Sequence, residues 1–268
     1  MEETDVGDLR IGFQRAGQGP PLLLLHGAVS DSRVWRLAVT AFARDHTVIA
    51  WDAPGCGRSS DPPDGFGMQD FGAVLAGFVD ALELDPAHVL GHSWGSTLAL
   101  QFCLDHPSSV RSLILVGGYA GWAGSLPAEE VRRRLDFADR AAEGIDAGTW
   151  DPRSMAGLFS DVMPVEHAEE LTQIMSDIRP AGTRTMARAL AECDLSDALP
   201  AVRVPTLLVH GDEDERSRPS IGRQLQASIP GSTLSVLPGL GHECHIEDPA
   251  AFEATVRAFL RTVEIRDR

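Results

Sequence analysis

Residues 87–104, AHVLGHSWGSTLALQFCL, join a short apolar run to a helical run through the pentapeptide GHSWG at 91–95. The two glycines of the pentapeptide allow a sharp turn, because a side chain there would collide with neighbouring backbone. A serine on such a strand-to-helix turn stands clear of the sheet, and the helix after it directs its first amides at the same point. Ser93 is therefore predicted to be a nucleophile. A G-x-S-x-G alone is weak support, and a plain helix N-cap serine is the alternative.

The order of strand and then helix repeats along most of the chain. Strand-like runs occupy 21–27, 46–52, 110–118, 205–214 and 232–242, and helical patterns occupy 68–83, 94–106, 217–228 and 249–263. This alternation predicts an α/β fold, with a mostly parallel, doubly wound sheet covered by helices on both faces. Residues 8–17, DLRIGFQRAG, are expected to add an antiparallel edge strand.

The alternation stops between residues 120 and 196. That stretch has no strand-like run, and it shows helical periodicity in PAEEVRRRLDFADRAAE (127–143) and PVEHAEELTQIMSDI (164–178). Pro127 and Pro164 fit the first turns of these helices. The stretch is too long for an ordinary connection. We therefore expect residues 1–119 and 197–268 to form one core domain, with residues 120–196 as a helical insertion.

The composition excludes several functions. The formal net charge of −16 argues against nucleic acids and anionic lipid surfaces as partners. All 23 basic residues are arginine, so neither Schiff-base chemistry nor a P-loop lysine is available. Four scattered cysteines without a C-x-x-C pair are typical of reduced thiols, and no apolar run is long enough to span a membrane. The N-terminus lacks the apolar stretch of a secretory signal, so the sequence predicts a cytoplasmic location.

Two later segments supply candidate partners for the serine. HGDEDERSRP (210–219) follows a strand-like run and carries four consecutive carboxylates, residues 212–215. GLGHECHIEDP (239–249) follows the last strand-like run and places His242 after a glycine-rich turn. A nucleophilic serine needs a histidine base, and that histidine needs a carboxylate to fix its tautomer. Chemistry alone leaves all four carboxylates open.

Read in order, LLLLHG, WDAPGCGRSS, GHSWGS, LLVHGDED and LPGLGHECHIEDP are similar to signatures of the α/β-hydrolase superfamily over essentially the whole chain. The resemblance implies Asp214 as the acid and His242 as the base, in the order Ser, Asp, His along the chain. It also implies that the amides of Ala28 and Trp94 form an oxyanion hole. Residues 120–196 would then be the helical cap over the pocket. The resemblance implies no metal or organic cofactor.

Within the superfamily the chain most resembles small serine esterases, enol-lactonases and haloperoxidase-like esterases. GHSWGSTLAL and GCGRS also resemble prolyl iminopeptidases, although HGAVSD stands here in place of their usual HGGPG loop. The prediction is a serine hydrolase that cleaves a small or medium carboxylic ester or lactone through an acyl-enzyme. The alternatives are an iminopeptidase-like aminopeptidase, a lyase or cyclase in biosynthesis, and a ligand-binding protein.

Residues 241–245, GHECH, raise the further alternative of a metallohydrolase. The H-E-x-x-H helix motif needs histidines four positions apart, whereas His242 and His245 are three apart. The expected partner is a small-molecule substrate, and a homodimer is left open. Side chains near the nucleophile and in the insertion are expected to contact the substrate, with ordinary packing as the alternative: Trp35, His92, Trp122, Phe137, Trp150, Phe159 and His245.

Overall fold

The computed structural model describes residues 1–266, and it is built on one eight-stranded sheet. The spatial order of the strands is β1-β2-β4-β3-β5-β6-β7-β8. Their bounds are β1 (Glu2–Val6), β2 (Leu9–Ala16), β3 (Pro21–Leu25), β4 (Thr47–Trp51), β5 (Ala87–His92), β6 (Val110–Val116), β7 (Thr206–Gly211) and β8 (Thr233–Leu237). Strands β3 to β8 pair in parallel, whereas β1 and β2 pair antiparallel. The predicted α/β class with a mostly parallel sheet is confirmed.

One expectation about the sheet edge is wrong. The segment expected as the edge strand is β2, which lies between β1 and β4 and is therefore internal. The edge is β1, a strand that the sequence pattern did not reveal. Its sequence EETDV is polar and largely exposed, so it lacks the apolar alternation that marks a half-buried strand.

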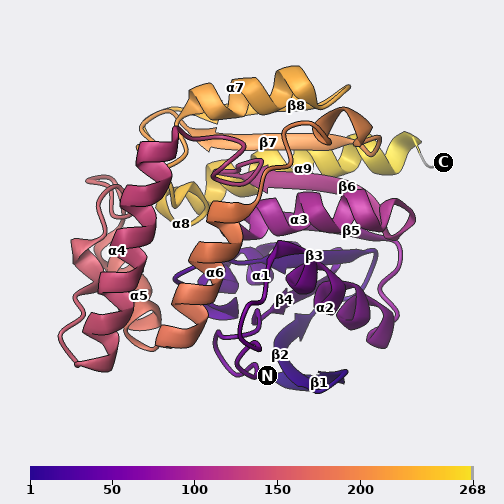
Figure 1. Cartoon of the computed structure of the whole chain (residues 1–268). Coiled ribbons are helices and arrows are strands. Elements are labelled where there is room, and N and C mark those ends of the chain that lie inside the picture. The colour runs from indigo at the N-terminus through magenta and orange to yellow at the C-terminus, as the bar shows by residue number, and fades with distance from the viewer. Residues whose placement is uncertain (267–268) are drawn as a thin grey trace.

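Helices cover both faces of the sheet (Figure 1). Helices α2 (Met68–Ala81), α3 (Trp94–Asp105) and α7 (Pro219–Ser228) pack on one face, and α1 (Arg36–Phe42) and α9 (Pro249–Arg266) pack on the other. Strand β3 supplies both cores, because alternate side chains point to opposite faces. Its Leu23 and Leu25 join the core under α2 and α3, whereas Leu22 and Leu24 join the core under α1 and α9.

Three helices of the segment between β6 and β7 lie at one end of the sheet (Figure 1). They are α4 (Ala128–Asp146), α5 (Val165–Ser176) and α6 (Pro180–Glu192), and the short helix α8 (Cys244–Glu247) lies near them. Pro127 and Pro164 are the N-cap residues of α4 and α5, one position before the first turn. The sequence pattern did not single out α6. Its Gly182 allows a close approach, because a Cβ there would overlap the backbone of Gly55.

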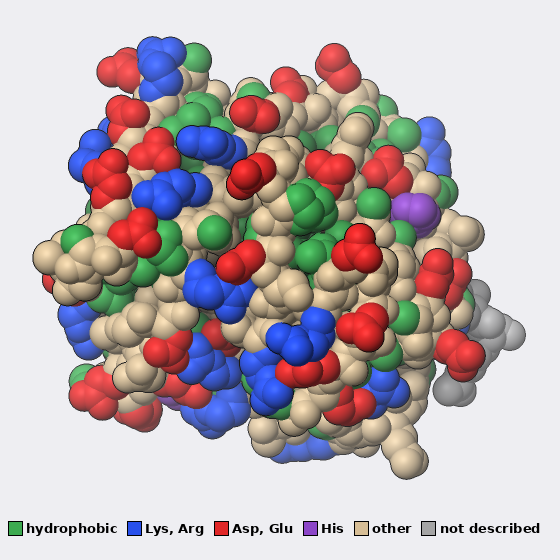
Figure 2. All heavy atoms as spheres, turned by 60° about the horizontal axis from the view of Figure 1, so that its bottom comes forward, with side chains coloured by type: hydrophobic (Ala, Val, Ile, Leu, Met, Phe, Trp, Pro, Cys, Tyr) green, Lys and Arg blue, Asp and Glu red, His purple; other side chains and the backbone are tan. Residues whose placement is uncertain are grey.

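The surface carries charges of both signs. On the face in Figure 2, acidic side chains are interspersed with arginines and with small apolar patches. Several arginines of the chain form ion pairs, such as Arg58 with Glu3 and Arg179 with Asp61. Within residues 1–266, no helix combines the length and the apolar character needed to cross a membrane.

Candidate active site

Ser93 occupies a strained turn between β5 and α3. Its backbone has φ 52° and ψ −113°, a conformation that residues other than glycine rarely adopt. The turn is held by the Ser93 amide, which donates a hydrogen bond of 2.8 Å to the carbonyl of Val116 in β6. A Cβ at Gly91 would overlap the carbonyl of Gly95, and a Cβ at Gly95 would overlap that of Leu25. Both glycines of the motif are therefore required by close backbone packing.

Asp214 and His242 meet at the ends of the neighbouring strands β7 and β8. Nδ1 of His242 lies 2.9 Å from Oδ2 of Asp214, and both side chains are buried. The other oxygen, Oδ1, accepts hydrogen bonds of 2.8 Å from the amides of Arg216 and Ser217. Burial raises the pKa of Asp214, but His242 and these hydrogen bonds outweigh it and leave the pKa below its usual value. The carboxylate is therefore ionised and its position is fixed.

Among the hydrogen bonds of the described residues, Asp214 is the only one of the four carboxylates at 212–215 that contacts a histidine ring. Asp212 caps the turn after β8 through the amide of Gly239, and Glu213 and Glu215 are exposed. The open choice from chemistry is thus resolved by position at the end of β7.

Gly117, which the sequence pattern did not indicate, leaves room for the His242–Asp214 pair. A Cβ on Gly117 would lie 3.0 Å from Cε1 of His242 and 3.4 Å from Oδ2 of Asp214. The residue has φ +52°, which suits glycine. The only sequence signal is the paired glycine that follows β6, and such pairs are common in turns.

The loop after β3 brings Ala28 into the wall of the cavity beside Ser93. A Cβ on the preceding Gly27 would lie 3.6 Å from Cβ of Ser93, so this loop runs close to the nucleophile. The ring of His26 fastens the loop, because its Nδ1 lies 2.7 Å from the carbonyl of Gly27 and its Nε2 accepts from the amide of Ala53 at 3.0 Å. Trp94 is the first residue of α3, where an amide has no acceptor within the helix. Ala28 thus lines the same cavity as Ser93, and Trp94 directly follows Ser93, so both stay candidates for the oxyanion hole.

A cavity of about 520 Å³ lies between the carboxyl ends of the strands and the helical insertion. Ser93, His242, Ala28 and His92 line its sheet side. The insertion contributes a mostly apolar wall, whose larger side chains are Trp122, Phe137, Met155, Leu158, Leu171 and Leu190. Three of the side chains expected to contact substrate, His92, Trp122 and Phe137, are therefore in the cavity wall.

Four side chains expected to contact substrate lie instead in packed positions, outside the described lining of this cavity. Trp35 is fully buried in the core under α1 and α9, with its ring centroid 4.5 Å from that of His245. Trp150 packs against Phe137 at 6.1 Å, and Phe159 lies under the guanidinium of Arg153. Trp35 and His245 pack in the core domain, and Trp150 and Phe159 pack within the insertion, so their contact with substrate stays a prediction.

His92, Glu243 and His245 form a buried cluster behind His242. Nε2 of His92 lies 3.0 Å from the carbonyl of His242, and burial lowers the pKa of both histidines, for His245 to about 3. Burial, together with the charges of Glu247 and Asp214, raises the pKa of Glu243 to about 8. At neutral pH the three side chains are therefore uncharged. Glu243 also lines the cavity, a role that its position in GHECH did not reveal.

Arginines surround the other side of the cavity: Arg133, Arg134, Arg216 and Arg218. Arg134 donates to the hydroxyl of Tyr119 and to the carbonyl of Arg216, so it is fixed at the wall. Arg216 donates to the carbonyl of Ala156, and burial lowers its pKa. Glu130 pairs with Arg133 and Arg134, and Glu215 also lines the cavity, so these carboxylates offset part of the guanidinium charge.

Comparison with known proteins places these features in a family context. The sequence profile described as "Alpha/beta hydrolase family" matches residues 22–255. A proline iminopeptidase of Heyndrickxia coagulans is 29% identical, over 97% of this chain and 98% of its own length. A thermophilic esterase of Thermogutta terrifontis is 27% identical with a TM-score of 0.83, covering 98% of this chain and 99% of its own. The enol-lactonase of Burkholderia xenovorans LB400 shares the fold, with a TM-score of 0.84, 22% identity and coverage of 97% and 100%.

Proposed function

This chain belongs to the alpha/beta hydrolase family, and we propose that it is a serine hydrolase that cleaves a small or medium carboxylic ester or lactone. One arrangement carries the proposal: His242, held at 2.9 Å by Asp214, and Ser93 on its strained turn both line one cavity. A strained serine, an oriented histidine and an ionised aspartate are the groups that acyl transfer needs.

The proposed reaction has two steps. Since Nδ1 of His242 is committed to Asp214, Nε2 is the nitrogen available to take the hydroxyl proton of Ser93 as its oxygen attacks the carbonyl carbon. The amides of Ala28 and Trp94 stabilise the oxyanion, and loss of one such donor costs roughly 3 kcal/mol. The protonated His242 then delivers its proton to the leaving alcohol. In the second step a water, activated by His242, hydrolyses the acyl-enzyme.

The charge of the cavity supports an ester or lactone over a peptide with a free amino terminus. Four arginines line the cavity, whereas Glu130 pairs with two of them and Glu215 lines the same wall, and Glu243 is protonated at neutral pH. The positive charge that remains disfavours an ammonium group. The volume of about 520 Å³ suits a small or medium substrate. The fold shared with an esterase and an enol-lactonase agrees with this class. The similarity to a proline iminopeptidase favours the second candidate, an aminopeptidase acting on N-terminal proline.

The test is a substrate panel of p-nitrophenyl esters, lactones and proline p-nitroanilide, assayed with wild type and Ser93→Ala. We expect ester or lactone hydrolysis that falls by at least about 10⁴-fold in Ser93→Ala. Ser176→Ala, an exposed serine on α5, is the matched control and should keep full activity. A fluorophosphonate should label wild type and the control but not Ser93→Ala. Activity that persists in Ser93→Ala would contradict the proposal, and a preference for proline p-nitroanilide would favour the aminopeptidase.

Two further parts of the proposal concern the surroundings of the enzyme. The partner is a small molecule that enters the cavity under α4 and α6, since both helices contribute to its wall. We also infer a cytoplasmic location. All four cysteines are unpaired and buried, as is typical of thiols in that reducing compartment.

A further inference from the structure

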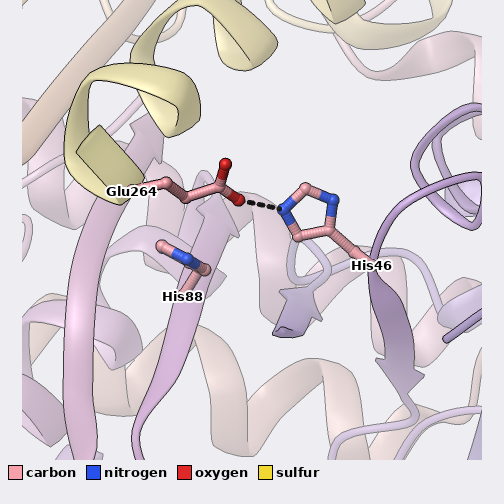
Figure 3. A group of neighbouring side chains, drawn as sticks. All are labelled: His46, His88 and Glu264. Atoms are coloured by element: carbon pink, nitrogen blue, oxygen red, sulfur yellow. Dashed lines mark ion pairs between the residues drawn. The ribbon is translucent and has the colours of Figure 1, made fainter. Parts of the chain in front are cut away.

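A second group of titratable side chains, His46, His88 and Glu264, lies where β4 and β5 begin (Figure 3). His46 precedes β4, His88 lies at the start of β5, and Glu264 lies near the end of α9. One ligand atom from each residue lies within 4.8 Å of the other two. Nε2 of His46 is 3.6 Å from Oε1 of Glu264, and the two imidazole rings are 6.0 Å apart. Three elements far apart in sequence therefore converge on one point.

The ring nitrogens of both histidines are used in the same way. Nδ1 of His46 lies 3.0 Å from Oδ1 of Asp45, and Nδ1 of His88 lies 2.7 Å from Oγ of Ser112. Both Nε2 atoms are buried and form no hydrogen bond within residues 1–266. His46 is 3% exposed and His88 is 0% exposed, so solvent has little access to either ring. A buried polar nitrogen without a partner is costly, which indicates that something else binds here.

The charges point to a cation. Nδ1 of His46 lies 3.0 Å from Asp45, and its Nε2 lies 3.6 Å from the carboxylate of Glu264, so the ring stands between two carboxylates. Two carboxylates around one ring favour a positive charge at this point.

We propose that His46, His88 and Glu264 bind a divalent transition-metal ion, with zinc as the best match. Two imidazole nitrogens and one carboxylate, with water as the fourth ligand, are a common zinc donor set. Asp45 and Ser112 would orient the two rings from behind, as outer partners of metal-bound histidines usually do.

The three ligand atoms must approach to about 3.3 Å of one another around a tetrahedral zinc. Glu264 can make most of this movement, since its side chain is 34% exposed and lies near the end of α9. The charge of Arg111 opposes a cation near His88, whereas the carboxylates of Glu264 and Asp45 favour it. Asp45 is itself paired with Arg257 of α9, so it contributes less than a free carboxylate.

The expected role of the ion is structural. The ion would connect α9 to the starts of β4 and β5, at the end of the strands opposite the cavity. Ser93 lies five residues beyond His88 along β5, which is about 17 Å at the rise of a strand. Zinc should therefore change the stability of the fold without taking part in turnover, and the inference does not depend on the proposed function.

The test uses full-length protein freed of any affinity tag and stripped with EDTA. Titration with ZnCl₂ in a calorimeter should show one site per chain, and saturating zinc should raise Tm by roughly 4 °C or more. Co²⁺ should give the visible absorption of a four-coordinate site. Glu264→Gln is the main variant, because the side chain is partly exposed and glutamine keeps its size; its Tm without zinc shows whether the variant folds. It should weaken zinc binding by at least tenfold, and His88→Gln should do the same.

Two control variants separate this site from other histidines. His106→Gln removes an exposed histidine, and Glu243→Gln alters the buried cluster near the cavity. Both should retain the zinc affinity and the Tm shift of wild type. If zinc neither binds nor raises Tm, or if Glu264→Gln binds it as tightly as wild type, the proposal is wrong. Loss of binding in Glu243→Gln alone would place the ion at the other cluster and equally overturn the proposal.

Discussion

Replacement of Glu243 by glutamine should stabilise the protein at alkaline pH. Glu243 is buried beside His92, His245 and the cavity, and its pKa is raised to about 8 from an ordinary value of 4.5. Burial is the largest cause, followed by the charge of Glu247, while Arg216 acts in the opposite direction. Glutamine resembles the protonated carboxyl group in shape and hydrogen bonding but never ionises, so it removes the cost of a buried charge.

The size of the effect follows from proton linkage. The folded state holds the Glu243 proton up to a pH of about 8, whereas the unfolded chain releases it near 4.5. The stabilising contribution of this proton is therefore complete below pH 4.5 and is lost as the pH rises through 8. Each pKa unit corresponds to about 1.4 kcal/mol, so the full loss is on the order of 5 kcal/mol. Wild type should lose stability relative to Glu243→Gln by about 1.4 kcal/mol per pH unit between pH 5 and 8.

The assay is reversible urea unfolding of both proteins at pH 5.5, 6.5, 7.5 and 8.5, read by circular dichroism and tryptophan fluorescence. Glu130→Gln is the control, because hydrogen bonding to Arg133 lowers the pKa of Glu130 to about 2. Its stability difference from wild type should change only below pH 4.5 and stay constant over the tested range. A constant difference between wild type and Glu243→Gln across the four pH values would refute the reasoning.

Three further predictions concern the candidate site. Asp214→Asn should lower kcat by about 10⁴-fold, as the same change does in a serine protease, because His242 adopts the wrong tautomer; ester assays check it. Gly117→Ala should lower kcat by roughly 10²-fold with little change in KM, since its Cβ would lie 3.0 Å from Cε1 of His242 and displace the ring. Cys244 is buried with a pKa raised well above its usual value, so native protein should react with DTNB only slowly and urea should expose all four thiols. Wild-type kinetics in Gly117→Ala, or rapid thiol modification in native protein, would count against these assignments.

Much of the fold was predictable because parallel strands buried on both faces leave a strong signal. PLLLL in β3 is apolar throughout, TLLVHG in β7 has an apolar centre and is fully buried, and the intervening helices have clear periodicity. The failures are elements whose position depends on partners. Strand β1 is polar and gains its place from pairing with β2, and α6 depends on its contact with the loop at Gly55.

The sequence by itself determined the nucleophile motif and the fold class, through glycines that a sharp turn requires and through strands that alternate with helices. Local chemistry left four carboxylates open as partners of His242, and the resemblance to α/β-hydrolases selected Asp214. Only the tertiary structure showed that Asp214 contacts His242, which aromatic rings reach the cavity, and that Gly117 makes room for the pair. It also raised the pKa of Glu243 and brought His46, His88 and Glu264 together. Burial, close approach and charge environment are set by residues distant in sequence, and no local pattern encodes them.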